Sequence, residues 1–169
     1  MTNIILTGFM GTGKSSVGKL LAKRLGYRFR DMDDMIVSRQ NMSINEIFEK
    51  YGEIHFRTLE AEAIRSISEE RGMVVSTGGG AVISKENRNM FRNIGLIVNL
   101  SASPEVILER LAQDDGRPLL SGSKDIATID RLMKEREPFY SDADIRIDTT
   151  GKKLDDVARE ILAFLEGRD

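Results

Sequence analysis

The stretch that decides the fold is GFMGTGKS, residues 8–15. It fits G-x-x-x-x-G-K-S/T, the phosphate-binding P-loop, whose backbone N–H groups wrap phosphates while the lysine reaches the outer phosphates and the hydroxyl meets Mg²⁺. Residues 3–7 before it form a short apolar run. After it, apolar residues recur at helical spacing from Val17 to Leu25, and Gly26 supplies a C-cap. The sequence therefore predicts a strand, a phosphate-binding loop and a helix.

Two other interpretations of this stretch are open. A glycine-rich turn can merely cap a helix. Alternatively, Gly11-Thr12-Gly13 begins a dinucleotide fingerprint, with Asp33 about twenty residues downstream in the place of the ribose-binding acid. In that fingerprint Ser16 occupies the third glycine position and Lys14 has no role, so the P-loop is favoured.

Composition and charge limit the class of protein. The 169 residues contain 25 Lys and Arg against 27 Asp and Glu, a net charge of −2, so no overall basic field indicates nucleic acid or an anionic membrane as a partner. The absence of cysteine excludes disulfides and thiolate metal sites. Residues 1–10 carry no basic residue, and no apolar run has transmembrane length. We therefore expect a cytoplasmic protein.

Strand and helix patterns alternate along the chain. Strands are predicted at 3–7, 27–31, 73–77, 96–100 and 145–147, and helices at 15–25, from 44, from 53, at 85–94, at 104–112, from 126 and around 157–165. This order predicts a three-layer α/β sandwich, a five-stranded parallel sheet with helices on both faces, as one domain over 1–169. Residues 113–124 lack core-facing periodicity, which predicts a mobile lid.

Candidate site residues follow the predicted strands. Asp31 and Asp33 come at the end of the second strand, where positions i and i+2 would share one face; an acidic cap between strand and helix is the alternative. The glycines of residues 78–80 follow the third strand and leave the backbone bare for a ligand. Ligands of such sheets bind at the carboxyl ends of the strands, so these loops should surround one crevice.

Six segments, taken together and in order, resemble the motif set of the shikimate kinase family. The resemblance covers essentially the whole chain. The segments are Gly8 to Ser15, Phe29-Arg30-Asp31-Met32-Asp33, Gly52-Glu53-Ile54-His55-Phe56-Arg57, Ser76-Thr77-Gly78-Gly79-Gly80-Ala81, Arg117-Pro118-Leu119-Leu120 and Arg136-Glu137-Pro138-Phe139-Tyr140.

The resemblance implies transfer of the γ-phosphate of ATP to the 3-hydroxyl of shikimate, with Mg²⁺, in a monomer. It implies a metal site at Ser15 and Asp31, catalytic roles for Lys14, Asp33 and Arg117, and a substrate-binding segment at 32–60. Phosphoryl transfer depends on positioning and charge neutralisation, which suits these residues. The implied nucleotide-binding residues are Gly11, Thr12, Gly13, Lys14, Ser15, Ser16, Arg110 and Arg117.

The acceptor side of the site is also implied by the resemblance. Arg57 and Arg136 would clamp the carboxylate of shikimate, with N–H contacts from Gly79 and Gly80, and Asp33 would hold the attacking hydroxyl. Glu60, one turn after Arg57, either holds that arginine or makes an ordinary surface pair.

Two rival functions are weighed against this one. A gluconate kinase would share the P-loop and the sheet, but it would not need paired arginines together with the triple glycine. A catalytically silent nucleotide-binding module would keep the fold and lose reactive groups, yet all of the expected groups are present in the sequence.

Overall fold

A parallel sheet forms the centre of the computed structural model, which describes residues 2–112 and 125–168. The strand order is β2-β3-β1-β4-β5, and every neighbouring pair is parallel. All the carboxyl ends of the strands therefore lie at one end of the sheet, where the site loops begin. The strands are β1 (Asn3–Thr7), β2 (Arg28–Asp31), β3 (Met73–Ser76), β4 (Gly95–Ser101) and β5 (Ile145–Asp148).

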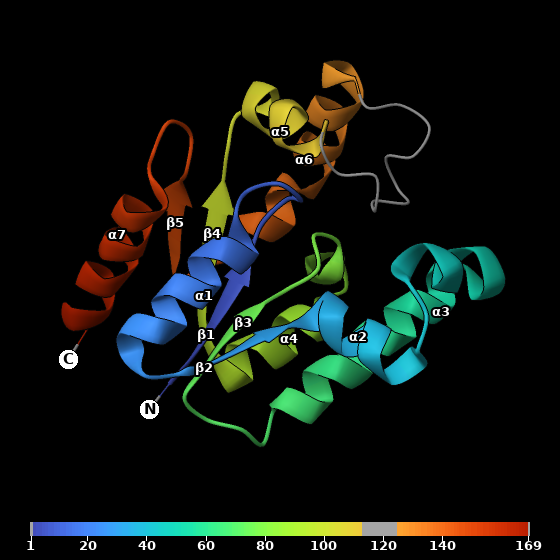
Figure 1. The fold of residues 1–169 in the computed structure, drawn as a ribbon, viewed down its shortest axis with the longest axis horizontal. Coiled ribbons are helices and arrows are strands. Elements are labelled where there is room, and N and C mark those ends of the chain that lie inside the picture. Colours follow the sequence, from blue (N-terminus) through green and yellow to red (C-terminus); the bar gives the residue numbers. More distant parts are fainter. Residues whose placement is uncertain (1, 113–124, 169) are drawn as a thin grey trace.

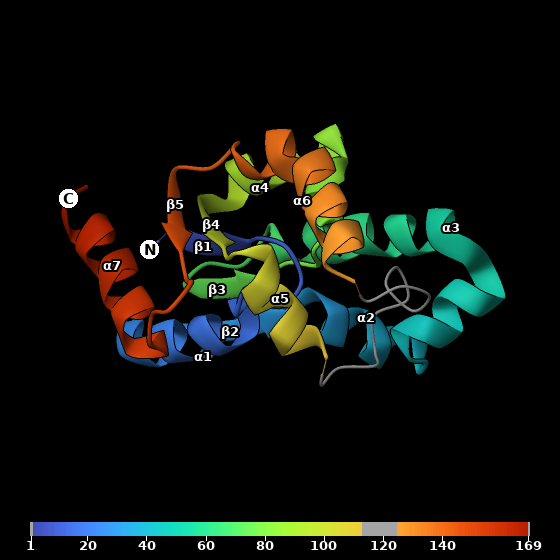
Figure 2. The same cartoon turned by 90° about the horizontal axis from the view of Figure 1, so that it is seen from above.

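Helices cover both faces of the sheet. Figures 1 and 2 show α1 and α7 on one side, with α4 and α6 on the other. Helices α2 and α3 pack against each other and extend to one side of the sheet. The helices are α1 (Lys14–Leu25), α2 (Met32–Gln40), α3 (Ile44–Ile67), the 3₁₀ helix η1 (Ala81–Ile83), α4 (Lys85–Ile94), α5 (Pro104–Leu111), α6 (Ile126–Tyr140) and α7 (Leu154–Glu166).

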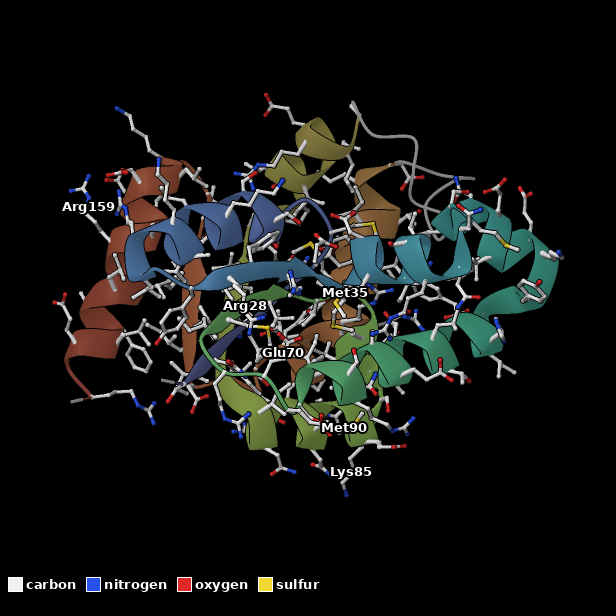
Figure 3. All side chains as sticks on the ribbon, turned by 60° about the horizontal axis from the view of Figure 1, so that its bottom comes forward. Arg28, Met35, Glu70, Lys85, Met90 and Arg159 are labelled. Atoms are coloured by element: carbon white, nitrogen blue, oxygen red, sulfur yellow. The ribbon has the colours of Figure 1, made fainter. Side chains whose placement is uncertain are left out.

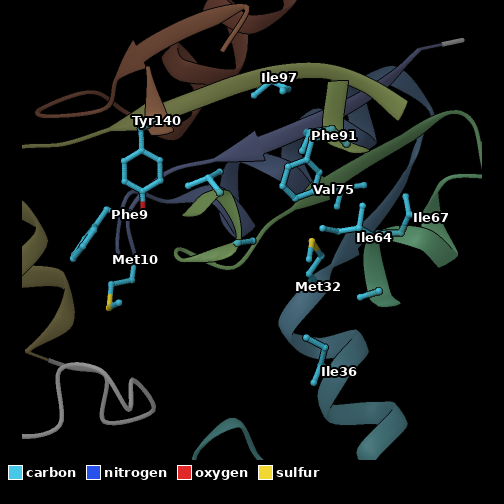
Figure 4. Packing of buried hydrophobic residues seen from close by; sticks show 14 of the residues in the cluster. Phe9, Met10, Met32, Ile36, Ile64, Ile67, Val75, Phe91, Ile97 and Tyr140 are labelled. Atoms are coloured by element: carbon cyan, nitrogen blue, oxygen red, sulfur yellow. The ribbon is translucent and has the colours of Figure 1, made fainter. Parts of the chain in front are cut away.

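Two apolar cores flank the sheet because successive strand residues point to opposite faces. In β1, Ile5 joins the core beneath α2, α3, α4 and α6, whereas Ile4 and Leu6 join the core beneath α1 and α7. Figure 4 shows part of the first core, with Val75, Ile97 and Tyr140 among its members. Strands buried on both faces carry continuous apolar runs, as observed here.

The five predicted strands and the three-layer arrangement are confirmed, with small shifts at the ends. Residues 32–40, where no helix is predicted, form α2. The helices predicted on either side of Gly52 are confirmed: Gly52 has φ 83° and ψ 173°, which are not helical torsions, and it interrupts α3 at a kink.

The edge of the sheet at β2 carries charge. Arg28 Nη1 lies 2.7 Å from Glu70 Oε2, and Figure 3 shows the two side chains next to each other. Charged side chains on an edge strand oppose pairing with another chain.

A hollow of about 450 Å³ lies at the opposite end of the sheet from the site loops. It is formed where β1 and β4 begin and where α7 ends, and its lining includes Thr2, Ile4, Tyr27, Leu96, Leu162 and Leu165. In residues 2–112 and 125–168, no helix has both the length and the apolar content needed to cross a bilayer.

Candidate functional site

The P-loop joins β1 to α1 and depends on glycine. Gly8, Gly11 and Gly13 have φ values of 147°, 80° and 93°, which other residues rarely adopt. A Cβ on Gly8 would also overlap the carbonyl oxygen of Leu100. Gly13 is the N-cap of α1, so the first N–H groups of the helix face the loop, where they can bind an anion.

Lys14 is buried, and its ammonium is held by the loop itself. Its Nζ donates to the carbonyl oxygens of Gly8 at 2.8 Å and Phe9 at 3.1 Å. Thr12 Oγ1 donates to the same Phe9 carbonyl at 2.8 Å, and Thr149 Oγ1 lies 3.2 Å from the carbonyl of Thr12. These bonds hold the charge of Lys14 inside the curve of the loop.

Ser15, in the first turn of α1, contacts Asp31, the last residue of β2. Ser15 Oγ donates to Asp31 Oδ2 at 2.6 Å and lies 3.3 Å from Ser76 Oγ. A hydroxyl and a carboxylate are hard oxygen ligands, and Mg²⁺ usually takes few protein ligands besides phosphate and water. The pair therefore fits a magnesium ion bound together with a nucleotide.

The expectation that Asp31 and Asp33 share one face of a strand is wrong. Asp31 is the N-cap of α2, accepting from the N–H of Asp34 at 3.2 Å, and Asp33 lies in the first turn of that helix. The acidic cap and the site are thus the same structure. Both carboxylates still line one cavity of about 160 Å³, together with Gly11, Gly13, Lys14, Ser15, Ser16, Ser76, Thr77 and Gly79.

The glycines of residues 78–80 stand between this cavity and two arginines. A Cβ on Gly80 would come within 2.6 Å of Arg57 Nη2, and one on Gly79 would lie 3.6 Å from Arg136 Nη1. A Cβ on Gly78 would lie 2.8 Å from Glu60 Oε1. At Gly78 and Gly80, the absence of a Cβ therefore lets charged side chains approach the backbone closely.

Glu60 is a buried partner of Arg57, not a surface residue. Its Oε2 accepts from Arg57 Nη1 at 2.7 Å, and its side chain is 1% exposed. Burial raises the pKa of Glu60; the charge and hydrogen bond of Arg57 oppose the rise only in part. Burial alone would lower the pKa of Arg57, but Glu60 and Glu53 raise it above the ordinary value.

Arg136 is buried on α6, at 5% exposure. Its guanidinium carbon lies 5.4 Å from the centroid of the Phe9 ring, in the P-loop. Among the described residues its Nη1 has no hydrogen-bond partner. A buried, charged donor in this condition is costly, so an anion that reached it would be bound strongly.

The remaining predicted residues are the arginines near the nucleotide side. Arg110, at the end of α5, is exposed, and its Nη1 donates to the carbonyl of Gly11 at 2.8 Å. Arg117 and the predicted lid at 113–124 lie outside the described residues.

Some residues at the site were not predicted from the sequence. Ser76 and Thr77 line the cavity, and the signal available was two hydroxyl residues at the carboxyl end of β3. Tyr140 was part of a quoted motif without a role, yet its hydroxyl donates to the carbonyl of Gly79 at 2.5 Å.

Comparison with known proteins gives one consistent family. The family model for shikimate kinase matches residues 10–166. A shikimate kinase of Geobacter metallireducens is 58% identical over 98% of this chain and 93% of its own length. A shikimate kinase of Geobacter sulfurreducens is 60% identical over 96% of this chain and 90% of its own length.

Solved structures agree with the sequence comparisons. A shikimate kinase from Acinetobacter baumannii, solved in complex with shikimate, is similar with a TM-score of 0.96 and 35% identity, covering 100% of this chain and 95% of that one. The shikimate kinase of Aquifex aeolicus has a TM-score of 0.86 and 41% identity, covering 98% and 97%.

Proposed function

The chain belongs to the shikimate kinase family, and from this premise we propose how its residues divide the work of the reaction. The reaction transfers the γ-phosphate of ATP to the 3-hydroxyl of shikimate and gives shikimate 3-phosphate and ADP. It depends on Mg²⁺ and belongs to the biosynthesis of chorismate and the aromatic amino acids.

The observation that carries the acceptor assignment is the state of Arg136. It is a buried cation with an N–H group that no described residue satisfies, next to Gly79. Arg57, by contrast, is already paired with Glu60. A small carboxylate bound by Arg136 and Arg57 would satisfy the donor, and planar, forked guanidinium groups suit this task better than lysine.

The donor half of the site is the P-loop. The N–H groups around Gly11, Thr12 and Gly13 and the hydroxyls of Ser15 and Ser16 bind the phosphates, and Lys14 neutralises charge on the transferring group. Ser15 would ligate Mg²⁺ and Asp31 would hold the ion through water. The ion would supply positive charge next to the phosphates.

Asp33 serves the attacking group. From the first turn of α2 its carboxylate accepts a hydrogen bond from the 3-hydroxyl and orients that oxygen toward the P-loop. Arg57 and Arg136 hold the carboxylate at the other end of the ring, and the N–H groups of Gly79 and Gly80 add to this hold. Substrate fixed at both ends brings the hydroxyl into line with the phosphate.

Other parts of the assignment rest on the resemblance. Arg110 covers the adenine from α5, where its bond to Gly11 already places it against the P-loop. Arg117, outside the described residues, would close over the phosphates from the lid at 113–124. We further propose that the enzyme is a single-domain monomer that acts in the cytoplasm.

The test is a coupled assay of ADP release with shikimate, quinate and gluconate. We expect turnover with shikimate, and Arg136→Lys should raise the shikimate KM at least about tenfold, which corresponds to about 1.4 kcal/mol, with little change in the ATP KM. Lysine keeps the charge but loses the forked donors.

The matched control is Arg131→Lys on the same helix, because that side chain is 61% exposed and pairs with Glu135. It should leave both KM values unchanged. Turnover of gluconate without shikimate would contradict the reaction, and a normal shikimate KM in Arg136→Lys would contradict the assignment of the clamp.

A further inference from the structure

The hydroxyl of Tyr140 contacts the loop after β3, and none of the roles proposed above involves it. Tyr140 is the last residue of α6, one helical turn after Arg136, and its side chain is buried. Its Oη donates to the carbonyl oxygen of Gly79 at 2.5 Å. Figure 4 shows Tyr140 at the same end of the packed core as Phe9 and Met10 of the P-loop.

The carbonyl that Tyr140 contacts belongs to the peptide that joins Gly79 to Gly80. The described chain has no cis peptide bond, so this peptide is planar and trans. In a trans peptide the C=O and the N–H point in opposite directions. Holding the oxygen of Gly79 on the side of Tyr140 therefore turns the N–H of Gly80 to the other side.

The loop cannot be held there by its own side chains. Neither Gly79 nor Gly80 has a side chain: a Cβ on Gly80 would overlap the guanidinium of Arg57, and one on Gly79 would press on the backbone N of Met10 at 3.3 Å. Glycine has the widest range of backbone conformations, and fixing it costs the most conformational entropy. A hydrogen bond from a rigid, buried ring is an efficient way to hold such a peptide in one orientation.

The protonation state of the phenol supports its role as a donor. Burial raises the pKa of Tyr140, and the positive charges of Arg136 and Arg57 offset this only in part. Because its pKa lies above the ordinary 10.0, the phenol is neutral at pH 7 and keeps the hydrogen that it donates.

We propose that Tyr140 is a positioning residue of the shikimate site. Its hydroxyl fixes the peptide between Gly79 and Gly80, so that the N–H of Gly80 and the guanidinium of Arg136 are presented to one carboxylate. Tyr140 and Arg136 lie on the same helix, so α6 sets both the charged and the backbone contact. This inference rests on the proposed function, because it assumes that the carboxylate binds at this loop.

The variant that tests the inference is Tyr140→Phe, which removes the hydroxyl and keeps the ring. We expect the shikimate KM to rise about five- to tenfold, or about 1 to 1.4 kcal/mol, with kcat and the ATP KM within twofold of wild type. Tyr27→Phe is the matched control, because Tyr27 lines the hollow at the other end of the sheet. All assays are run at a temperature at which circular dichroism shows the variant folded.

A second measurement separates positioning from simple support of α6. We expect the double variant Tyr140→Phe, Arg136→Lys to lose less shikimate-binding free energy than the sum of the losses in the two single variants. Both changes act on the same carboxylate, so their effects should not add. A purely structural role would instead lower the melting temperature and leave the shikimate KM as it is, or raise both KM values together. Either of these results, or full additivity, overturns the inference.

The two proposals fail in different ways. If wild type does not phosphorylate shikimate, the proposed function is wrong. If wild type does so and Tyr140→Phe keeps a normal shikimate KM, only the role of Tyr140 is wrong.

Discussion

Asp31 takes part in two structures at once. One carboxylate oxygen caps α2 through the N–H of Asp34, and the other accepts from Ser15 at 2.6 Å. The residue assigned to the metal site therefore also fixes the start of the helix that carries Asp33. Loss of an N-cap typically costs about 1 kcal/mol, so a substitution here would affect stability as well as activity.

Asp33→Asn should lower kcat by about 100-fold or more, because the amide loses the charge that orients and accepts hydrogen from the attacking hydroxyl. The fold should be retained, since the change keeps the size of the side chain in an incompletely buried position. Steady-state kinetics and thermal denaturation measure the two effects separately.

The neighbouring Asp34→Asn is the control for Asp33→Asn. Asp34 is exposed and lies in the same turn of α2. It should retain most of the wild-type kcat. A kcat close to wild type in Asp33→Asn would remove that residue from the catalytic assignment.

Glu60 should make the stability of the protein depend on pH. Its folded pKa is raised above the ordinary 4.5, chiefly by burial, so its contribution to stability is fully present below 4.5 and is lost as the pH rises through the folded value. Glu60→Gln cannot titrate. We therefore expect the free energy of unfolding of wild type to fall, relative to that of Glu60→Gln, as the pH rises from 4.5.

Urea unfolding of both proteins across this pH range tests the prediction. Glu49→Gln, an exposed residue of the same helix, controls for the loss of one negative charge. A constant difference between wild type and Glu60→Gln over the whole range would show that Glu60 does not titrate as proposed.

The packing of α1 on the sheet depends on Gly18. A Cβ there would lie 2.5 Å from a ring carbon of Phe29 and 3.1 Å from Leu6 Cδ1. Overpacking typically costs about 1–3 kcal/mol. The better helix propensity of alanine returns about 1 kcal/mol at most. Gly18→Ala should therefore lower the free energy of unfolding while the folded enzyme keeps its KM values.

Gly167→Ala is the comparison for Gly18→Ala. Gly167 has a negative φ, and a Cβ there meets nothing closer than 3.6 Å. It should be neutral or slightly stabilising, because alanine restricts the unfolded chain. A Gly18→Ala protein as stable as wild type would mean that α1 can shift on the sheet at little cost.

Strands and most helices could be predicted because their residues are buried in regular patterns. Helix α2 could not be predicted in the same way: it is short, its first turn is acidic, and the aspartates were interpreted as a strand end. Met32 and Ile36 are its buried residues, and their i, i+4 spacing was the available signal. The break predicted at Gly52 is confirmed, because Gly52 leaves helical torsions and separates two helical segments of α3.

The chemical groups of the site could be predicted from motifs, but their environment could not. A P-loop pattern identifies Lys14 and Ser15 from local sequence alone. The burial of Glu60 and the bond from Tyr140 to Gly79 depend on contacts between α3, α6 and the loop after β3, which are far apart in the chain. Spacing within one helix cannot distinguish a buried pair from a surface pair.

The chain should behave as a monomer of 18.9 kDa in light scattering, with and without shikimate. In residues 2–112 and 125–168, the large apolar side chains that are exposed lie on four separate elements, and scattered residues of this kind are normal on monomers. They are Tyr51 and Ile54 on α3, Ile83 on η1, Ile126 on α6 and Leu154 on α7. A stable dimer at micromolar concentration would contradict this expectation.

The hollow of about 450 Å³ beside Tyr27 and Leu162 has a consequence for inhibitor discovery. A fragment lodged there would stabilise the native state by mass action and would register as a hit in a melting-temperature screen. It would nevertheless leave the P-loop and the two arginines, Arg57 and Arg136, accessible, because these lie at the other end of the sheet. Screens should therefore rank fragments by competition with shikimate or ATP, since stabilisation alone would mix inhibitors with bystanders.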